Sequence, residues 1–386
     1  MNALSKVAQN YPRSGIRRMF DLAANCEDVI SLCLGEPNFD TPPHIVEAAK
    51  EALDQGLTHY TPNAGMVELR QVVADKYERE FGLEYSADNV MITVGAMEAL
   101  YLSLATIIDP GDEVIVPDPY FPSYVGQVTM LGGKVVPVPV REENQFKLQA
   151  EDVEKAITQK TKAILINSPS NPLGSMLEKE DLEALAQVAE GHNLIVLSDE
   201  VYEKIIYDGS SHFSIAQVPG MKERTIIINS FSKTYAMTGW RVGYLLADEK
   251  IVEHMPKLQE GIAACVPAFV QKAAVAALTG DQEIVGKMVA DYTRRRSILI
   301  DGLNQIPGFR CQKSPGTFYA FPNIKEFGKT SQEFAEELLF EAGVVTVPGS
   351  AFGSMGEGYL RLSFANSDEN LQEAVRRIAE HVKKKY

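Results

Sequence analysis

The chain has few cysteines and no long apolar run, and both absences narrow the class of protein. Its four cysteines lie far apart without a Cys-x-x-Cys pair, so we expect reduced thiols rather than disulfides or a zinc site. No segment approaches the ~18 apolar residues of a membrane helix, and the N-terminal segment lacks the apolar stretch of a signal peptide. A cytoplasmic protein without a membrane partner is expected.

Positive charge is also scarce. The chain has 37 lysines and arginines against 52 acidic residues, a net charge of −15, which disfavours nucleic acid and anionic membranes as partners. Any anion must therefore bind at a local site. Apolar residues are plentiful: they make up 45% of 386 residues, enough for the core of one large and one small domain.

Seven short apolar segments, rich in β-branched residues, alternate with stretches of helical periodicity such as residues 96–108 and 178–190. This alternation predicts an α/β fold, with a mostly parallel sheet that helices cover on both faces. The predicted strands are residues 90–94, 114–116, 134–140, 163–167, 194–197, 225–229 and 242–247.

The pattern changes after about residue 280. A helix with three consecutive arginines leads to short segments at 309–312, 317–321, 344–347 and 359–364, and a last helix is capped near Ser367 or Asp368. This order is typical of an α+β unit. We expect a large domain at residues 48–280 and a smaller domain made of residues 1–47 with 281–386.

Residues 230–243, SFSKTYAMTGWRVG, place one lysine between hydroxyls and an arginine. A predicted strand ends just before them, and ligands of open α/β sheets bind at the carboxyl ends of strands. Lys233 can form a Schiff base with a carbonyl when its amine is unprotonated. Ser230, Ser232 and Arg241 can supply the donors that a phosphate needs. An ordinary surface lysine on a serine-rich loop is the alternative.

Three other strand ends carry polar groups. Free amides at residues 95–97 begin a helix and suit an anion, although a plain turn explains them equally well. Asp199 and Tyr202 follow the run 194–197, and an ionised Asp199 could keep a pyridine nitrogen protonated; acids at strand ends are also common in other α/β enzymes. Two prolines stiffen the loop NSPSNPLG at 167–174 and would fix Asn171 as a hydrogen-bond donor. Alternatively, these residues only form a turn.

Taken together, these segments resemble the aspartate aminotransferase family, the fold-type I enzymes that use pyridoxal 5′-phosphate, over essentially the whole chain. The resemblance implies that Lys233 carries the cofactor, that Asp199 pairs with its ring nitrogen and that Tyr202 contacts its 3′-oxygen. It makes Lys233, Asp199 and Tyr202 the catalytic residues. The implied cofactor-binding residues are Tyr60, Gly95, Ala96, Met97, Phe121, Asn171, Asp199, Tyr202, Ser230, Lys233 and Arg241.

The same resemblance implies how substrate binds. Arg361 would form a bidentate pair with the α-carboxylate, with Asn171 and the amide of Gly35 beside it. Asn38 replaces the family's more frequent aspartate in the Gly35 loop, a departure expected to affect loop structure. The implied reaction transfers an amino group from an L-amino acid to a 2-oxo acid such as 2-oxoglutarate by ping-pong kinetics, with Lys233 moving the α-proton. The small domain is expected to close over bound substrate.

Two further implications concern the partner subunit and the substrate side chain. Tyr60 resembles the tyrosine that reaches the phosphate of the neighbouring subunit, so a homodimer with shared active sites is implied. Residues 14–21 are more similar to aromatic or broad-range enzymes than to dedicated aspartate enzymes, and Ile16 offers apolar surface. No cation for a distal carboxylate is identified; Arg17 is a candidate only because it is near in sequence.

Three functions other than transamination are compared with the sequence. A lyase of the same fold, of the carbon–sulfur type, would keep Lys233, Asp199 and Arg361. A non-enzymatic regulator would carry a DNA-binding segment, for which the chain has no room before residue 30. A nicotinamide-dependent dehydrogenase would need a G-x-G-x-x-G motif after a strand, and none is present.

Overall fold

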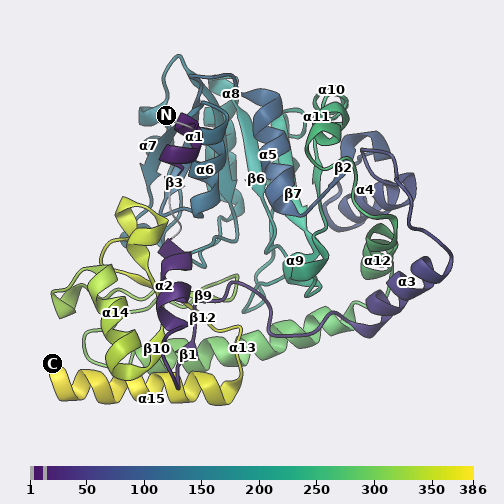
Figure 1. The fold of residues 1–386 in the computed structure, drawn as a ribbon. Helices are drawn as coiled ribbons and strands as arrows, with labels where there is room; N and C mark the ends of the chain where they lie inside the picture. The colour runs from purple at the N-terminus through teal and green to yellow at the C-terminus, as the bar shows by residue number, and fades with distance from the viewer. Residues whose placement is uncertain (1–3, 12–14) are drawn as a thin grey trace.

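The computed structural model describes residues 4–11 and 15–386. A large sheet with its helices lies above a smaller unit, and the long helix α13 runs from below the large unit into the smaller one (Figure 1). Ser14, which belongs to the segment predicted to shape the substrate pocket, lies outside the described residues. Within the described part of the chain, no helix is long and apolar enough to cross a membrane.

The large sheet has seven strands in the order β2-β8-β7-β6-β5-β3-β4, and all except β8 run in one direction. This confirms the predicted mostly parallel sheet. The strands are β2 (Val90–Thr93), β3 (Glu113–Asp118), β4 (Lys134–Pro139), β5 (Thr161–Asn167), β6 (Ile195–Asp199), β7 (Thr225–Ser230) and β8 (Gly243–Leu246).

Helices cover both faces of this sheet because its central strands are apolar on both sides. In β7, Ile226 and Ile228 belong to one buried cluster, whereas Ile227 between them belongs to another. The first face is covered by α5 (Ala96–Ile107), α6 (Pro122–Met130), α10 (Glu249–Val252) and α11 (Met255–Ile262). The second is covered by α4 (Val67–Phe81) and α12 (Ala268–Thr279) at one end, and by α7 (Ala150–Ala156) and α8 (Lys179–Gly191) at the other.

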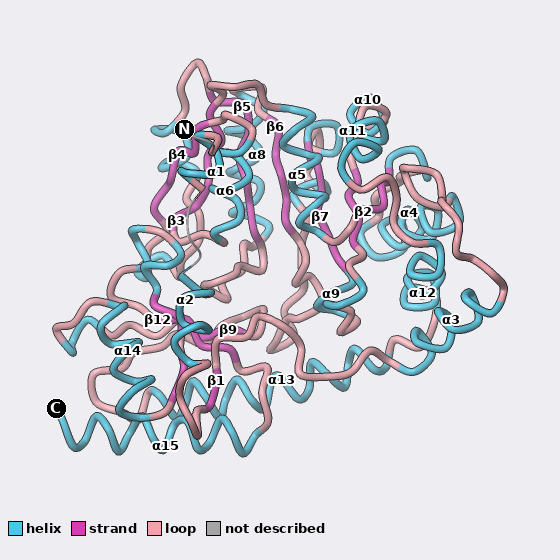
Figure 2. The backbone as a smooth tube through the Cα atoms, viewed as in Figure 1, coloured by secondary structure: helices cyan, strands magenta, loops and turns pink. Residues whose placement is uncertain are grey.

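The smaller unit combines short strands with long helices (Figure 2). β1 (Ile30–Ser31) pairs with β10 (Val344–Val345), and an antiparallel sheet has the order β11-β12-β9, from Val347–Pro348, Leu360–Ser363 and Tyr319–Ala320. The helices are α2 (Gly15–Ala23), α13 (Glu283–Leu303), α14 (Ser331–Ala342) and α15 (Asp368–Lys385). Of the short segments predicted here, 309–312 forms no strand and contributes only an isolated bridge between Arg310 and Asn323.

The predicted domain limits fall at two different kinds of position. The limit at 280/281 lies between α12 and α13. The limit at 47/48 falls inside α3 (Pro43–Asp54), which packs against α12 of the large unit. The division at these residues stays a prediction.

The carboxyl ends of the central strands meet above the smaller unit (Figure 1). β5, β6 and β7 are neighbours and end at Asn167, Asp199 and Ser230. Register pairs Asn167 with Asp199 directly. Three polar side chains are thereby fixed at one edge of the sheet, where α/β proteins bind ligands.

Candidate active site

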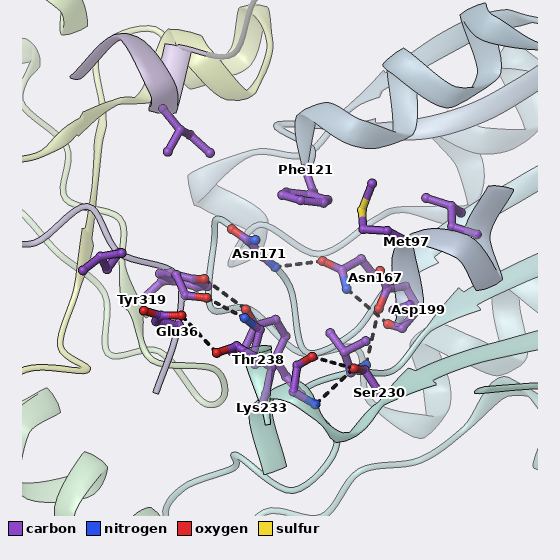
Figure 3. Close-up of a pocket in the computed structure, with 18 of the residues that line it drawn as sticks. Glu36, Met97, Phe121, Asn167, Asn171, Asp199, Ser230, Lys233, Thr238 and Tyr319 are labelled. Atoms are coloured by element: carbon purple, nitrogen blue, oxygen red, sulfur yellow. Dashed lines mark hydrogen bonds between the residues drawn. The ribbon is translucent and has the colours of Figure 1, made fainter. Parts of the chain in front are cut away.

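A cavity of about 310 Å³ lies between the strand ends and the smaller unit. Figure 3 shows Phe121 on one side of it and Lys233 and Ser230 on the other. The large unit contributes Ala96, Met97, Phe121, Asn171, Asp199, Tyr202, Ser230, Lys233 and Arg241, and the smaller unit contributes Ile16, Gly35 and Arg361. Segments far apart in sequence thus enclose one space.

Lys233 lies in α9 (Phe231–Thr234), the single turn that follows β7. Its Nζ donates to the carbonyl oxygen of Gly35 at 2.5 Å. Loss of water around the amine lowers the pKa of Lys233 to about 8; Arg361 and Arg241 add to this effect, and Glu36 opposes it. About a tenth of the amine is therefore unprotonated at pH 7, far more than in an ordinary lysine, and the unprotonated form is the one that a nucleophile requires.

Asp199 is a buried acid at the end of β6. Its Oδ2 accepts a hydrogen bond from the hydroxyl of Tyr124 at 2.7 Å, and Oδ1 accepts from the amide of Val201 at 3.3 Å. Burial raises the pKa of Asp199 to about 6, although the bond from Tyr124 works in the opposite direction. A cationic ring nitrogen beside this carboxylate would stabilise its charged form.

An anion site forms where α5 begins. Gly95 is the N-cap of α5 with φ 77°, and a Cβ there would lie 2.7 Å from Nη2 of Arg241. The arginine thus lies directly over a residue that has to be glycine, for its φ as well as for space. The hydroxyl of Ser230 donates to that of Ser232 at 2.9 Å on the same side of the cavity. Helix amides, hydroxyls and a guanidinium are together suited to a phosphate.

Arg361 is only 2% exposed and lies between the rings of Tyr319 and Phe352, 4.5 and 4.9 Å from their centroids. It donates to Oδ1 of Asn171 at 3.1 Å and to the carbonyl oxygen of Cys33 at 2.6 Å. Its Nε is buried and has no hydrogen-bond partner among the described residues. A buried guanidinium with a donor to spare suits a carboxylate.

Residues 33–41 form a strap across the cavity. Besides accepting from Arg361 and Lys233, the strap is joined to the lysine loop by the hydroxyl of Thr238, which donates to Glu36 at 3.0 Å. Asn38 accepts from Arg295 of α13 at 2.8 Å. The residue that departs from the family pattern therefore ties the strap to α13, and the effect of the departure on loop structure stays a prediction.

Some predicted residues do not reach the cavity. Tyr60 is 91% exposed and is not part of its lining. Arg17 is paired with Asp21 on α2 and also lies outside it. Tyr202 does line the cavity, and its hydroxyl lies 3.0 Å from that of Tyr319.

Sequence reasoning missed several lining residues. Tyr124 lies three residues after the predicted cofactor-binding residue Phe121, so its place on the first turn of α6 could have been noticed. Asn167 is the last residue of a predicted strand and donates to the carbonyl oxygen of Asp199 at 3.1 Å. Tyr319 and Cys33 carry no motif, and only tertiary structure brings them here.

A lysine of lowered pKa, a buried acid and an anion-binding helix start at one sheet edge suit an enzyme that holds a phosphorylated ring cofactor. The family of class I and II aminotransferases matches residues 27–378, and the chain belongs to that family. Pyridoxal-phosphate-dependent transamination is accordingly its activity, and the comparisons give no support to a lyase.

The chain is 48% identical over 386 residues to aromatic-amino-acid aminotransferase 2 of Thermococcus litoralis, with 99% of each chain covered. It is 49% identical over 375 residues to an aspartate aminotransferase of Pyrococcus abyssi, with 96% of each covered. Among solved structures, an aromatic aminotransferase from Pyrococcus horikoshii superimposes with a TM-score of 0.91 at 46% identity, covering 96% of this chain and 99% of that one.

The residues present fit pyridoxal 5′-phosphate. Asp199 is a buried acid with a phenol and an amide as its bonded partners, and it can face a protonated ring nitrogen. The guanidinium over Gly95 lies where a helix N-terminus also attracts a phosphate.

Proposed function

We propose that this aminotransferase acts on aromatic or a broad range of L-amino acids, with a 2-oxo acid such as 2-oxoglutarate as acceptor, and that it works as a cytoplasmic homodimer with shared active sites. The similar relatives carry both aromatic and aspartate names. The four cysteines are free, in keeping with a reducing compartment.

The strand ends of the large sheet would hold the cofactor. Lys233 carries it covalently, Ser230 and Arg241 bind its phosphate with the amides of residues 95–97, and Phe121 covers its ring. Asp199 faces the ring nitrogen, while Asn171 and Tyr202 lie toward the 3′-oxygen. When bound, pyridoxal 5′-phosphate supplies an electron sink for charge that develops at the substrate's α-carbon.

The smaller unit would hold the substrate. Arg361 binds the α-carboxylate, supported by Asn171 and the amide of Gly35, and this fixes the α-carbon near Lys233. The free Nζ of Lys233 then removes the α-proton and later returns one. One observation supports these roles most strongly. Lys233, whose pKa is lowered, and Arg361, whose buried Nε has no hydrogen-bond partner among the described residues, line the same cavity.

Preference for apolar side chains is supported by the rest of the lining. Ile16, Phe20 and Leu34 are apolar, and each described cation of the lining already has a role with the cofactor or the α-carboxylate. A distal carboxylate would find no further cation among these described lining residues. A large apolar side chain gains contact with the same wall.

A panel of amino donors tests the substrate class. Purified enzyme with pyridoxal 5′-phosphate should lose the absorption band of the lysine-bound cofactor on addition of phenylalanine, tyrosine or tryptophan, with kcat/KM for these donors at or above that for aspartate. Lys233→Ala should show no such band. A strict preference for aspartate over every aromatic donor would contradict the aromatic or broad range, and an active Lys233→Ala protein would contradict the role of the lysine.

Subunit sharing is supported by the exposure of Tyr60, with Val67 and Ile262 as further exposed apolar side chains. Mixing inactive Lys233→Ala with weakened Tyr60→Ala provides a test. The two variants are unfolded and refolded together, so that hybrid dimers form. Each hybrid has one site with the native Lys233 from one subunit and the native Tyr60 from the other. Activity should therefore exceed the sum of the separate variants. No gain, with hybrids verified by a tag on one subunit, would exclude a shared tyrosine.

A further inference from the structure

A buried carboxylate and imidazole lie behind the cavity, at the end of β6. Glu200 and His212 have side chains that are 1% and 3% exposed, with Oε2 and Nε2 3.0 Å apart. Successive side chains of an extended chain point to opposite sides, so Glu200 faces away from the cavity that its neighbour Asp199 lines. Neither Glu200 nor His212 is part of the cavity lining.

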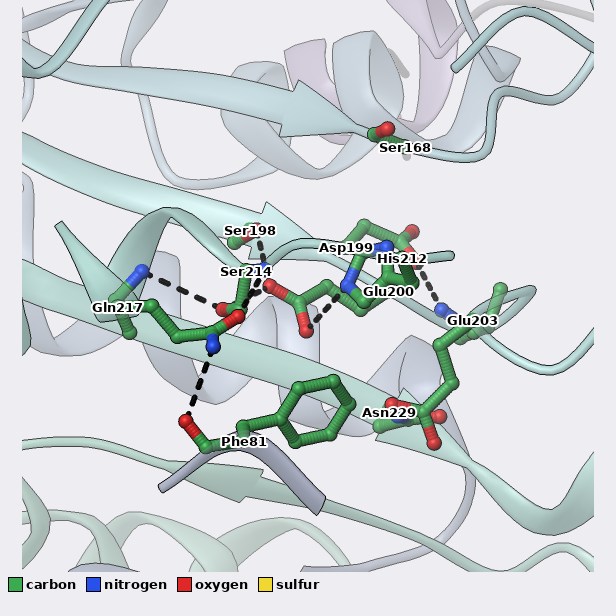
Figure 4. Close-up of polar contacts among 12 residues, drawn as sticks. Phe81, Ser168, Ser198, Asp199, Glu200, Glu203, His212, Ser214, Gln217 and Asn229 are labelled. Carbon is green, nitrogen blue, oxygen red and sulfur yellow. Dashed lines mark hydrogen bonds and ion pairs between the residues drawn. The ribbon is translucent and has the colours of Figure 1, made fainter. Parts of the chain in front are cut away.

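Glu200 is held from several directions. Its Oε1 accepts hydrogen bonds from the hydroxyls of Ser198 at 2.8 Å and Ser214 at 2.6 Å. Figure 4 shows the carboxylate between Ser214 on one side and His212 on the other. Burial opposes ionisation, but the charge of His212 and the donated hydrogen bonds lower the pKa of Glu200. The carboxylate is therefore ionised, and its contact with His212 is favourable when Nε2 carries a proton.

Glu200 directly follows Asp199, the proposed catalytic acid, and main-chain hydrogen bonds hold both residues. The amide of Glu200 donates to the carbonyl oxygen of Ile228 in β7 at 2.9 Å, and the carbonyl oxygen of Asp199 accepts from the amide of Ser168 at 3.2 Å. The carbonyl oxygen of Glu200 accepts from the amide of Glu203 at 3.0 Å. Glu200 is the first residue of the turn that follows Asp199, and its contact with His212 helps to hold that turn in place. Tyr202 lies in the same turn.

Burying such a pair costs free energy that apolar side chains would not cost, so stability alone does not account for it. His212 belongs to a loop, residues 208–214, and its side chain ties that loop to the strand end. Both of its ring nitrogens, and Oε2 of Glu200, are buried without a hydrogen bond among the described residues. The ion-pair contact of 3.0 Å between Nε2 and Oε2 is therefore the polar contact that orients the ring.

We propose that Glu200 and His212 form a positioning pair, which fixes the turn after β6 so that the carboxylate of Asp199 faces the cofactor ring. This inference rests on the proposed role of Asp199. Removal of the imidazole leaves Oε2 of Glu200 buried without its ion-pair partner, which costs free energy. We expect the turn to move so that this oxygen reaches water. Arg361 is carried by other elements and should not respond.

The chain contains a matched control. His381 of α15 and Glu337 of α14 form a second buried pair, with Nε2 and Oε1 2.7 Å apart and side chains 6% and 4% exposed. This pair lies in the smaller unit, away from the cavity lining. His212→Phe and His381→Phe therefore each remove a buried imidazole from a buried carboxylate, and only the first of these carboxylates adjoins Asp199. Glu337 keeps its contacts with Lys329, Lys385 and Tyr386.

The two variants are compared as holoenzymes. His212→Phe should weaken binding of pyridoxal 5′-phosphate about tenfold, lower kcat about tenfold, and change KM for phenylalanine less than twofold. His212→Gln, whose amide can donate to Oε2, should regain most of both. His381→Phe should lower the thermal midpoint while cofactor affinity, absorption spectrum and kcat stay at the wild-type level.

Equal cofactor affinity and kcat in His212→Phe and His381→Phe would overturn the positioning role. If His212→Phe does not fold, Ser214→Ala decides the question, since it removes one donor from Glu200: a cofactor affinity equal to wild type would also overturn the proposal. Failure of the proposed function is distinguishable, because wild-type enzyme would then show no lysine-bound cofactor band and no transamination.

Discussion

The two walls of the cavity are built in different ways. One wall consists of the ends of hydrogen-bonded neighbouring strands, which carry Asp199, Ser230 and, one turn later, Lys233. The other consists of Arg361, Tyr319 and the strap, which come from separate segments of the smaller unit. Strand pairing fixes the strand ends of the first wall. In the second wall it joins only the strands of Arg361 and Tyr319, β12 and β9, and the side chain of Arg361 ties them to the strap at Cys33.

The difference suits the two tasks that we assign to the walls. A cofactor that remains bound through a catalytic cycle needs a rigid frame, and parallel strands buried on both faces provide one. A substrate that enters and leaves needs groups that can rearrange. Contacts between the walls include those of Lys233 with Gly35, Thr238 with Glu36, and Arg361 with Asn171.

Arg361→Lys gives the largest effect that we expect on the second wall. Lysine keeps the charge but loses the planar pair of donors and the stacking between two rings, so kcat/KM for amino acids should fall about 10²-fold, mainly through KM. Steady-state kinetics with phenylalanine and 2-oxoglutarate measure this change. Cofactor affinity should stay near wild type, because the strand-end wall is unaltered.

Arg296→Lys serves as the control for this substitution. Arg296 is also buried, lies over the ring of Tyr207 at 4.5 Å, and donates to both carboxylate oxygens of Asp208 at 2.7 and 2.8 Å. It does not line the cavity, so its replacement should cost stability without raising KM. A similar rise in KM in both variants would mean that Arg361 acts through packing and not through a substrate carboxylate.

The same contrast explains what the sequence predicted. Asp199 and Lys233 could be placed because each follows an apolar strand, and strand ends converge by rule. The bond between Arg361 and Asn171 joins residues 190 positions apart, and that between Tyr124 and Asp199 joins residues 75 apart. No local pattern encodes such pairs, since they depend on how the two units meet.

The strap at residues 33–41 shows which contacts could be predicted from the sequence and which could not. Its loop was predicted to contact substrate through the backbone of Gly35, and Gly35 does line the cavity. That its carbonyl oxygen would accept from Lys233, and that Asn38 would accept from Arg295 of α13, depends on residues that lie 198 and 257 positions further along the chain. The periodicity of β-branched residues carries no information about these partners.

Tyr124→Phe gives a smaller and more specific effect on the strand-end wall. The hydroxyl of Tyr124 lowers the pKa of Asp199, so its loss should raise that pKa further above its ordinary value. In the role that we propose, Asp199 works ionised, so activity should be lost as pH falls through its pKa. The acidic limb of the kcat/KM profile should therefore move to higher pH, with about a tenfold loss at neutral pH and less at alkaline pH.

Tyr207→Phe separates this effect from the general loss of a buried phenol, because the hydroxyl of Tyr207 is also buried and donates to the carbonyl oxygen of Thr317 at 2.5 Å, outside the cavity lining. Its profile should keep the wild-type acidic limb. If Tyr124→Phe keeps that limb as well, the hydroxyl does not tune Asp199 and the strand-end wall acts by shape alone. If the limb moves only in Tyr124→Phe, the rigid wall also sets the ionisation of its acid, so that the frame and the chemistry of the cofactor are maintained by the same strand end.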